Sequence, residues 1–152
     1  MTKRIRFYLP GFGVQAIATL LEDRAPATCR MVWELLEKVM EAPVHHGTET
    51  GPELWFFIPN RPDLPYEHCT VFPAPGDVVV YHRLPGIVAS NEEVSDIGIY
   101  YDRGGKNLIA SLGWIPCNVF ATVTENLAAL ACAARDVPPS GKERIIVSRA
   151  ME

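Results

Sequence analysis

Short segments with the residue pattern of β-strands recur along most of the chain, and this repetition most constrains the fold. Lys3 to Leu9 and Val14 to Leu21 alternate apolar and polar residues on either side of a glycine-containing turn, which predicts a β-hairpin. Further segments have strand character: Leu54–Ile58, Val78–Tyr81, Ile97–Tyr101, Leu108–Leu112, Phe120–Val123 and Arg144–Ser148. So many short strands predict a large, mainly antiparallel sheet.

Two segments interrupt the strand pattern with helical periodicity. From Pro26 to about Met40, apolar residues recur at intervals of three and four, and proline suits the first helical position, where its missing N–H would be unpaired anyway. Thr124 to Arg135 is rich in alanine and leucine, and Thr124 is the expected N-cap. Between these helices, residues 59–75 contain five prolines, which predicts an ordered loop.

The size and charge of the chain exclude several functional classes. With 152 residues and no low-complexity tract, we expect one domain spanning residues 1–152. The net charge of −4 and the scattered Lys and Arg residues argue against a nucleic-acid partner. The longest apolar stretch, Leu127–Ala134, is too short to cross a membrane, and the N-terminus has no signal pattern. We therefore expect a cytoplasmic protein with no membrane partner.

Four segments, taken in order, resemble the cyclophilin superfamily. Ala18–Trp33, ATLLEDRAPATCRMVW, is similar to that family's strand, acidic turn, Ala-Pro-x-Thr and first helix, and Asn118–Val137, NVFATVTENLAALACAARDV, resembles its Val-Phe-x-x-Val strand and last helix. Between them, Gly51–Pro59 and Gly76–Tyr81 look like segments of a smaller, uncharacterised prokaryotic branch, so we expect a bacterial protein. The resemblance implies a mainly β fold, a closed eight-stranded barrel capped by two α-helices.

The motifs of working prolyl isomerases in that superfamily are absent. Those proteins carry Phe-His-Arg after the first helix and Gly-Ser-Gln-Phe-Phe in mid-chain, which supply an arginine and a glutamine to the prolyl amide. Here the segment that follows the first helix reads His45, His46, Gly47, Thr48, and the next arginine after it is Arg61. Without a guanidinium, the twisted transition state has no obvious electrostatic stabiliser. Prolyl isomerase activity is therefore not expected, and other enzymatic activity stays open.

Several polar residues are candidates for a ligand pocket at the mouth of the barrel. His46 and Glu53 can bring an imidazole and a carboxyl together, although adjacent His45 and His46 must point to opposite sides of a strand. Tyr81, Tyr101 and Arg103 end two predicted strands and can line the same mouth. The alternatives are solvent-exposed loop histidines, tyrosines that pack against the helices, and a simple turn at Asp102-Arg103.

Aromatic residues and one asparagine complete the candidate set. Trp55, Trp114 and Phe120 can wall a pocket or a proline groove, and Asn118 can bind an amide ligand. The alternative is core packing, with Asn118 closing a turn. Metal ligation by His45, His46, His68 and His82 is not predicted because their spacing matches no metal motif, and no cofactor is expected.

Three functions follow from these residues. The leading hypothesis is a barrel that binds a small polar amide or carboxylate ligand, and a reaction on that ligand stays open. The second is a peptide-binding or proline-binding module with weak or no isomerase activity, using Trp55, Trp114 and Phe120. The third is a homo-oligomeric interaction protein whose exposed aromatic residues form the interface between subunits.

Overall fold

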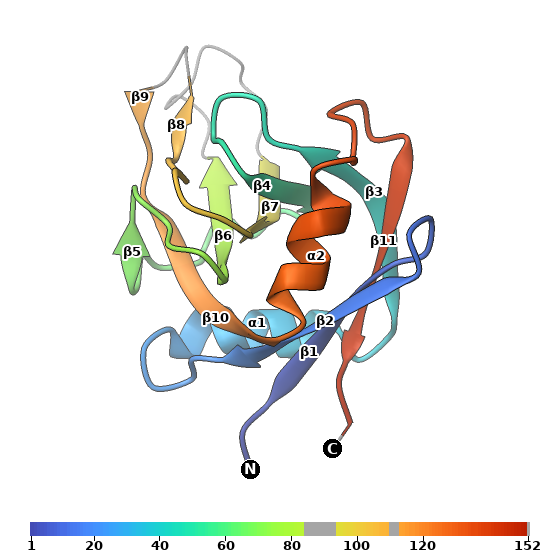
Figure 1. Cartoon of the computed structure of the whole chain (residues 1–152). Helices are drawn as coiled ribbons and strands as arrows, with labels where there is room; N and C mark the ends of the chain where they lie inside the picture. Colours follow the sequence, from blue (N-terminus) through green and yellow to red (C-terminus); the bar gives the residue numbers. More distant parts are fainter. Residues whose placement is uncertain (84–93, 110–112, 152) are drawn as a thin grey trace.

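A closed antiparallel β-barrel forms the body of the molecule in the computed structural model, which describes residues 1–83, 94–109 and 113–151. Its strands follow the order β2, β1, β11, β3, β4, β7, β6, β10, and pairing of β10 with β2 closes the ring (Figure 1). The bounds are β1 Arg4–Leu9, β2 Val14–Leu20, β3 Met40–His46, β4 Glu53–Ile58, β6 Asp77–Arg83, β7 Val94–Tyr100, β10 Cys117–Glu125 and β11 Glu143–Arg149. This confirms the predicted closed eight-stranded barrel.

Alternation along the strands fills the barrel with apolar side chains. In the hairpin of β1 and β2, Ile5 and Phe7 pair with Ala18 and Ala16, and all of these side chains are fully buried. Small residues on one strand opposite large residues on the next allow close packing inside a narrow barrel. The alternation of apolar and polar residues in the sequence therefore identifies which side chains point into the barrel and which point outward.

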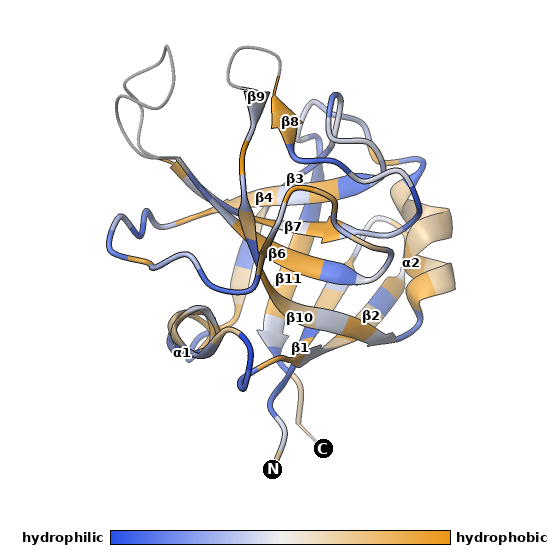
Figure 2. Cartoon of the chain, turned by 90° about the vertical axis from the view of Figure 1, so that its left-hand side faces the viewer, coloured by the Kyte–Doolittle hydropathy of each residue, from blue (hydrophilic) through white to orange (hydrophobic). Residues whose placement is uncertain are grey.

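Two helices lie at opposite ends of the barrel, α1 at Pro26–Leu35 and α2 at Leu127–Ala134 (Figure 2). The prediction that the first helix extends to Met40 is wrong, because residues 40–46 form strand β3 and pair with β11. Ala42 and Val44 point into the barrel while Glu41 and Pro43 face outward, so the segment has strand alternation. Without this strand, β11 and β4 would each lack a neighbour.

The predicted N-cap of the second helix is also wrong. Thr124 lies in β10, and its hydroxyl is 3.0 Å from the Thr19 hydroxyl of β2, across the pair of strands that closes the barrel. Asn126 occupies the N-cap position, with a left-handed φ of 62° and no side-chain capping bond. Barrel closure extends the strand past Thr124, so the helix starts later than its composition suggests.

Shorter elements and one apolar layer lie outside the barrel. Strand β5 (Cys69–Thr70) pairs with the start of β10, and β8 (Leu108–Ile109) pairs with β9 (Gly113–Trp114). The rest of the predicted strand Leu108–Leu112 lies outside the described residues. A second apolar cluster packs on the outer faces of β6, β7 and β10: Val79, Tyr81, Tyr100, Ile115, Cys117 and Val119. Within the described ranges, no helix is long and apolar enough to cross a membrane.

Candidate functional site

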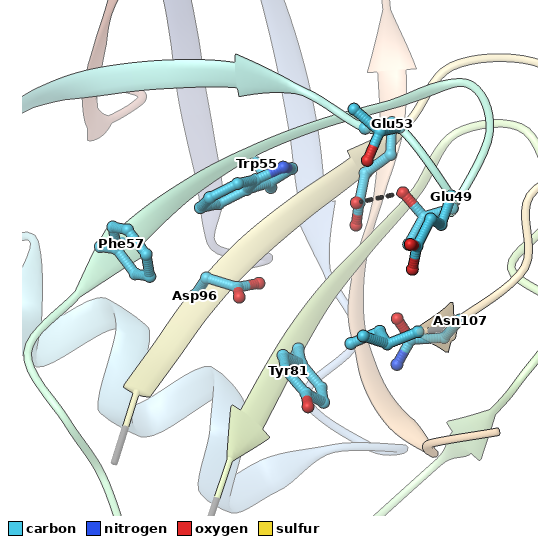
Figure 3. A pocket seen from close by; sticks show the side chains of 11 residues that line it. Glu49, Glu53, Trp55, Phe57, Tyr81, Asp96 and Asn107 are labelled. Atoms are coloured by element: carbon cyan, nitrogen blue, oxygen red, sulfur yellow. Dashed lines mark hydrogen bonds between the residues drawn. The ribbon is translucent and has the colours of Figure 1, made fainter. Parts of the chain in front are cut away.

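An open pocket of about 160 Å³ lies on the outer face of strands β4, β7 and β6 (Figure 3). Trp55 and Phe57 come from β4, Asp96 from β7 and Tyr81 from β6. Its lining residues are Gly47, Thr48, Glu49, Thr50, Glu53, Trp55, Phe57, Tyr81, Asp96, Asn107 and Ile109. The expected position at the barrel mouth is therefore wrong for this pocket, because alternate residues of β4 point outward here while Leu54, Phe56 and Ile58 point into the barrel.

The carboxyl group of Glu53 is the buried acidic group among the described residues of the pocket. Glu53 is only 6% exposed, and its Oε1 accepts a 2.8 Å hydrogen bond from the Thr50 hydroxyl. Oε2 lies over Gly98 of β7, where a Cβ atom would collide with it. Glycine at position 98 therefore leaves the space that the carboxyl occupies.

Burial raises the pKa of Glu53 to about 7. Loss of solvent favours the neutral acid, and the Thr50 hydrogen bond opposes this effect only in part. The Tyr100 hydroxyl, on the facing residue of β7, also lowers the pKa of Glu53. Glu53 therefore exchanges its proton near neutral pH, unlike an ordinary surface glutamate.

Aromatic rings form one wall beside this carboxyl. Trp55 stacks on His45 with ring centroids 4.2 Å apart, and the Phe57 ring meets Trp55 edge to face at 5.0 Å. His45 Nδ1 lies 3.0 Å from the carbonyl oxygen of Pro139, which is consistent with donation from the ring N–H. His45 thus supports the tryptophan and does not itself line the pocket.

The remaining polar lining is acidic or neutral. Glu49 and Asp96 add two carboxyl groups to that of Glu53, and no lysine or arginine is among the described lining residues. Asn107 is buried and its amide donates a 2.6 Å hydrogen bond to the carbonyl oxygen of Ile115. Lys106 lines a neighbouring hollow together with Glu49. The pocket itself is therefore rich in carboxyl groups and aromatic rings.

The expected constellation of His46, Tyr101 and Arg103 with Glu53 and Tyr81 is not assembled. His46 Nε2 lies 2.6 Å from the Tyr101 hydroxyl, and Nδ1 lies 2.7 Å from the Gly47 carbonyl oxygen, to which it is placed to donate. His46 faces Leu54 across the strands, on the opposite face of the sheet from Glu53. Arg103 is exposed in a turn. Strand alternation separates these groups.

The other expected pocket walls are also distributed elsewhere. Phe120 is fully buried in the barrel core, and Trp114 is half exposed, 5.0 Å from the Phe72 ring. Neither residue is among those that line the pocket with Trp55. The expected proline groove of Trp55, Trp114 and Phe120 is therefore wrong, because these residues lie on different surfaces of the strands.

Asn118 holds together the segments around it, and its hydrogen-bonding capacity is used within the fold. Its amide nitrogen donates to the Thr28 hydroxyl at 3.1 Å and to the Pro65 carbonyl oxygen at 2.8 Å. Its carbonyl oxygen accepts from the backbone of Glu67 and from the thiol of Cys69. Asn118 thus joins β10, α1 and the proline-rich loop.

Sequence reasoning finds only part of the pocket lining. Of the expected residues, Glu53, Trp55 and Tyr81 line it. Phe57 has the same two-residue spacing as Glu53 and Trp55, so strand alternation alone is a sufficient signal for it. Asp96 and Asn107 come from distant segments, and only the pairing of β7 with β4 and β6 brings Asp96 beside them.

The closed barrel with a helix at each end is a cyclophilin-like fold, as comparison with solved structures shows. The structure described as McbB in complex with tryptophan matches with a TM-score of 0.68 and 18% identity, over 97% of this chain and 45% of that chain. The crystal structure of the Mimivirus cyclophilin matches with a TM-score of 0.60 and 12% identity, over 99% and 90% of the two chains. This chain thus spans less than half the length of McbB.

Residues 8–148 match the family described as Protein of unknown function (DUF3830), so the chain belongs to this family. No curated protein matches the sequence. The family membership agrees with the resemblance to an uncharacterised branch of cyclophilin-like proteins.

Proposed function

We propose that this chain binds a small polar molecule in the outer pocket, against the carboxyl group of Glu53. The observation that carries the proposal is a carboxyl group on a residue only 6% exposed, placed in a pocket that is open to solvent. Burial of an acid costs stability unless something compensates for it, and such groups cluster at functional sites.

The size of the pocket limits the ligand. A cavity of about 150 Å³ holds one benzene molecule, and this pocket has a volume of about 160 Å³. The ligand, or the part of it that enters, is therefore about as large as one six-membered ring. The McbB structure is described as a complex with tryptophan, so in that protein a chain that contains a similar fold binds a small molecule.

The lining favours a ligand that donates hydrogen bonds. Glu49, Glu53 and Asp96 present carboxyl oxygens, and no described lining residue carries a positive charge. A carboxylate ligand, one of the two classes expected from the sequence, would meet like charge here. An amide or amine ligand instead offers N–H groups to these acceptors.

A thermal-shift screen of small amides, ureas and amines tests the proposal. We expect hits that raise Tm in a concentration-dependent way, and a smaller shift for the same hits in Glu53→Gln. Glu41→Gln is the matched control, because Glu41 is exposed on β3 and pairs with Arg144 outside the pocket. The proposal fails if no compound raises Tm, or if Glu53→Gln and Asp96→Asn leave every shift unchanged.

A further inference from the structure

We propose that the pocket selects a positively charged nitrogen compound, an organic ammonium or amidinium ion, held between the carboxyl groups and the aromatic wall. This inference rests on the proposed function and names the class of ligand. Three observations carry it: the acidic lining, the oriented carboxyl group of Glu53 and the aromatic rings beside it.

Among the lining residues that the structure describes, the charged side chains are all acidic. Carboxyl groups of Glu49, Glu53 and Asp96 converge on the pocket from the loop after β3, from β4 and from β7 (Figure 3). Lys106 is placed in the adjacent hollow and is not a lining residue of this pocket. A cation entering the pocket therefore meets attraction from several directions, and an anion meets repulsion.

The Glu53 side chain supplies an oriented hydrogen-bond acceptor in addition to its charge. Thr50 fixes Oε1 at 2.8 Å, so the carboxyl group is already oriented before a ligand arrives. Oε2 lies over Gly98, whose lack of a side chain leaves the space that this oxygen occupies. The hydroxyl of the fully buried Tyr100, on the facing residue of β7, also interacts with this carboxyl group. A ligand N–H group that enters the pocket would meet the Glu53 carboxyl group, because Glu53 lines the pocket.

The aromatic wall favours a cation over a neutral donor of the same shape. Trp55, Phe57 and Tyr81 all line the pocket, and His45 stacking holds the indole ring in place. Cations are attracted to the electron-rich faces of aromatic rings, most strongly to tryptophan. A carboxyl group opposite aromatic rings thus contacts both the charge and the apolar body of an ammonium compound.

The proton on Glu53 couples binding to pH. Burial raises the pKa of this carboxyl to about 7, and a bound cation favours the ionised form. The titratable groups nearby are Glu49 in the loop, Asp96 and Tyr100 on β7, Tyr81 on β6 and Cys117 on β10. Burial raises the pKa of Tyr100 and of Cys117, so both stay neutral. Affinity for a cation should therefore rise with pH as Glu53 ionises.

Isothermal titration with benzylammonium, benzamide and benzoate tests the ligand class with one ring size and three charges. At about pH 8 we expect benzylammonium to bind about tenfold more tightly than benzamide, and benzoate to bind most weakly. Between about pH 6 and about pH 8, benzylammonium affinity should rise severalfold, with proton release to the buffer. Glu53→Gln should reduce benzylammonium affinity about tenfold and change benzamide affinity about twofold or less.

Controls separate the possible outcomes. Glu41→Gln should leave all three affinities unchanged, and Asp96→Asn provides a second pocket variant if Glu53→Gln does not fold. Binding of benzamide or benzoate at least as tight as that of benzylammonium overturns the cation inference and leaves the proposed function standing. A benzylammonium affinity that does not rise with pH also overturns the inference. No binding of any probe overturns both proposals.

Discussion

At the scale of single residues, the position of the Glu53 carboxyl depends on the absence of a side chain at Gly98. The carboxyl of Glu53 fills the space above Gly98 on the neighbouring strand, and a side chain at position 98 would displace it. The absent side chain therefore determines where the acid lies, and burial at that place determines its pKa.

Replacing Glu53 by glutamine should change how stability depends on pH. The folded pKa of about 7 lies above the ordinary value of 4.5, so the folded protein binds the proton more tightly than the unfolded chain does. The contribution of Glu53 to the wild-type free energy of unfolding should therefore be largest below about pH 4.5. It should fall as the pH rises to about 7 and stay level at higher pH. The loss is on the order of 3 kcal/mol at most.

Chemical denaturation at a series of pH values measures this effect. Glu53→Gln keeps the shape of the side chain but does not titrate. The free energy of unfolding of Glu53→Gln should therefore increase relative to that of wild type between about pH 5 and about pH 8. Glu41→Gln should follow the wild-type profile. Parallel profiles for wild type and Glu53→Gln would show that the carboxyl is not desolvated.

At the scale of elements, the first helix depends on a loop that is distant in the sequence. Its N-cap residue, Ala25, has no side-chain acceptor to offer. Glu67 of the proline-rich loop accepts instead, from the backbone N–H of Thr28 at 2.6 Å and from its hydroxyl at 2.9 Å. A carboxylate at a helix N-terminus satisfies an otherwise unpaired N–H and interacts favourably with the helix dipole.

Glu67→Ala should destabilise the protein by about 1 to 2 kcal/mol, because it leaves the Thr28 N–H without this acceptor. Hydrogen exchange of the first turn of α1 should accelerate more than that of α2. Glu37→Ala, an exposed change just after the other end of α1, is the matched control. Equal stability of wild type and Glu67→Ala would contradict the capping role.

Most elements could be predicted from local pattern, and the exceptions have physical causes. The β1–β2 hairpin follows from the alternation of apolar and polar residues, and β4 follows from its continuous run of apolar and aromatic residues. Strand β3 is hidden because Met40 also continues the helical spacing of the preceding segment, and only pairing with β11 decides between the two. In the pocket, Glu53 and Trp55 are neighbours on one strand, whereas Asp96 joins them only through strand pairing. No local signal specifies such pairing.

At the scale of the whole molecule, every barrel strand has two neighbours, so no strand can leave without breaking hydrogen bonds on both sides. Both helices pack on this ring, α1 against β10 and α2 against β2. We therefore expect residues 1–152 to behave as one folding unit. The expected homo-oligomer stays a prediction that light scattering can measure.

Unfolding by denaturant should show a single transition in which far-UV circular dichroism and tryptophan fluorescence coincide. Phe120→Ala should lower the unfolding free energy by about 3 to 5 kcal/mol and shift both signals together, because the Phe120 ring is fully buried in the core. Tyr66→Ala, at an exposed ring, should shift neither signal appreciably. Two separate transitions would contradict a single folding unit.

The outer apolar layer has a consequence for how such proteins can diversify. Strands β4, β6 and β7 contribute alternate residues to the barrel interior and to the pocket side, so each position serves only one of the two. Substitutions on the outward positions can retune recognition while the inward positions preserve folding. One barrel can in this way carry outer pockets with different linings.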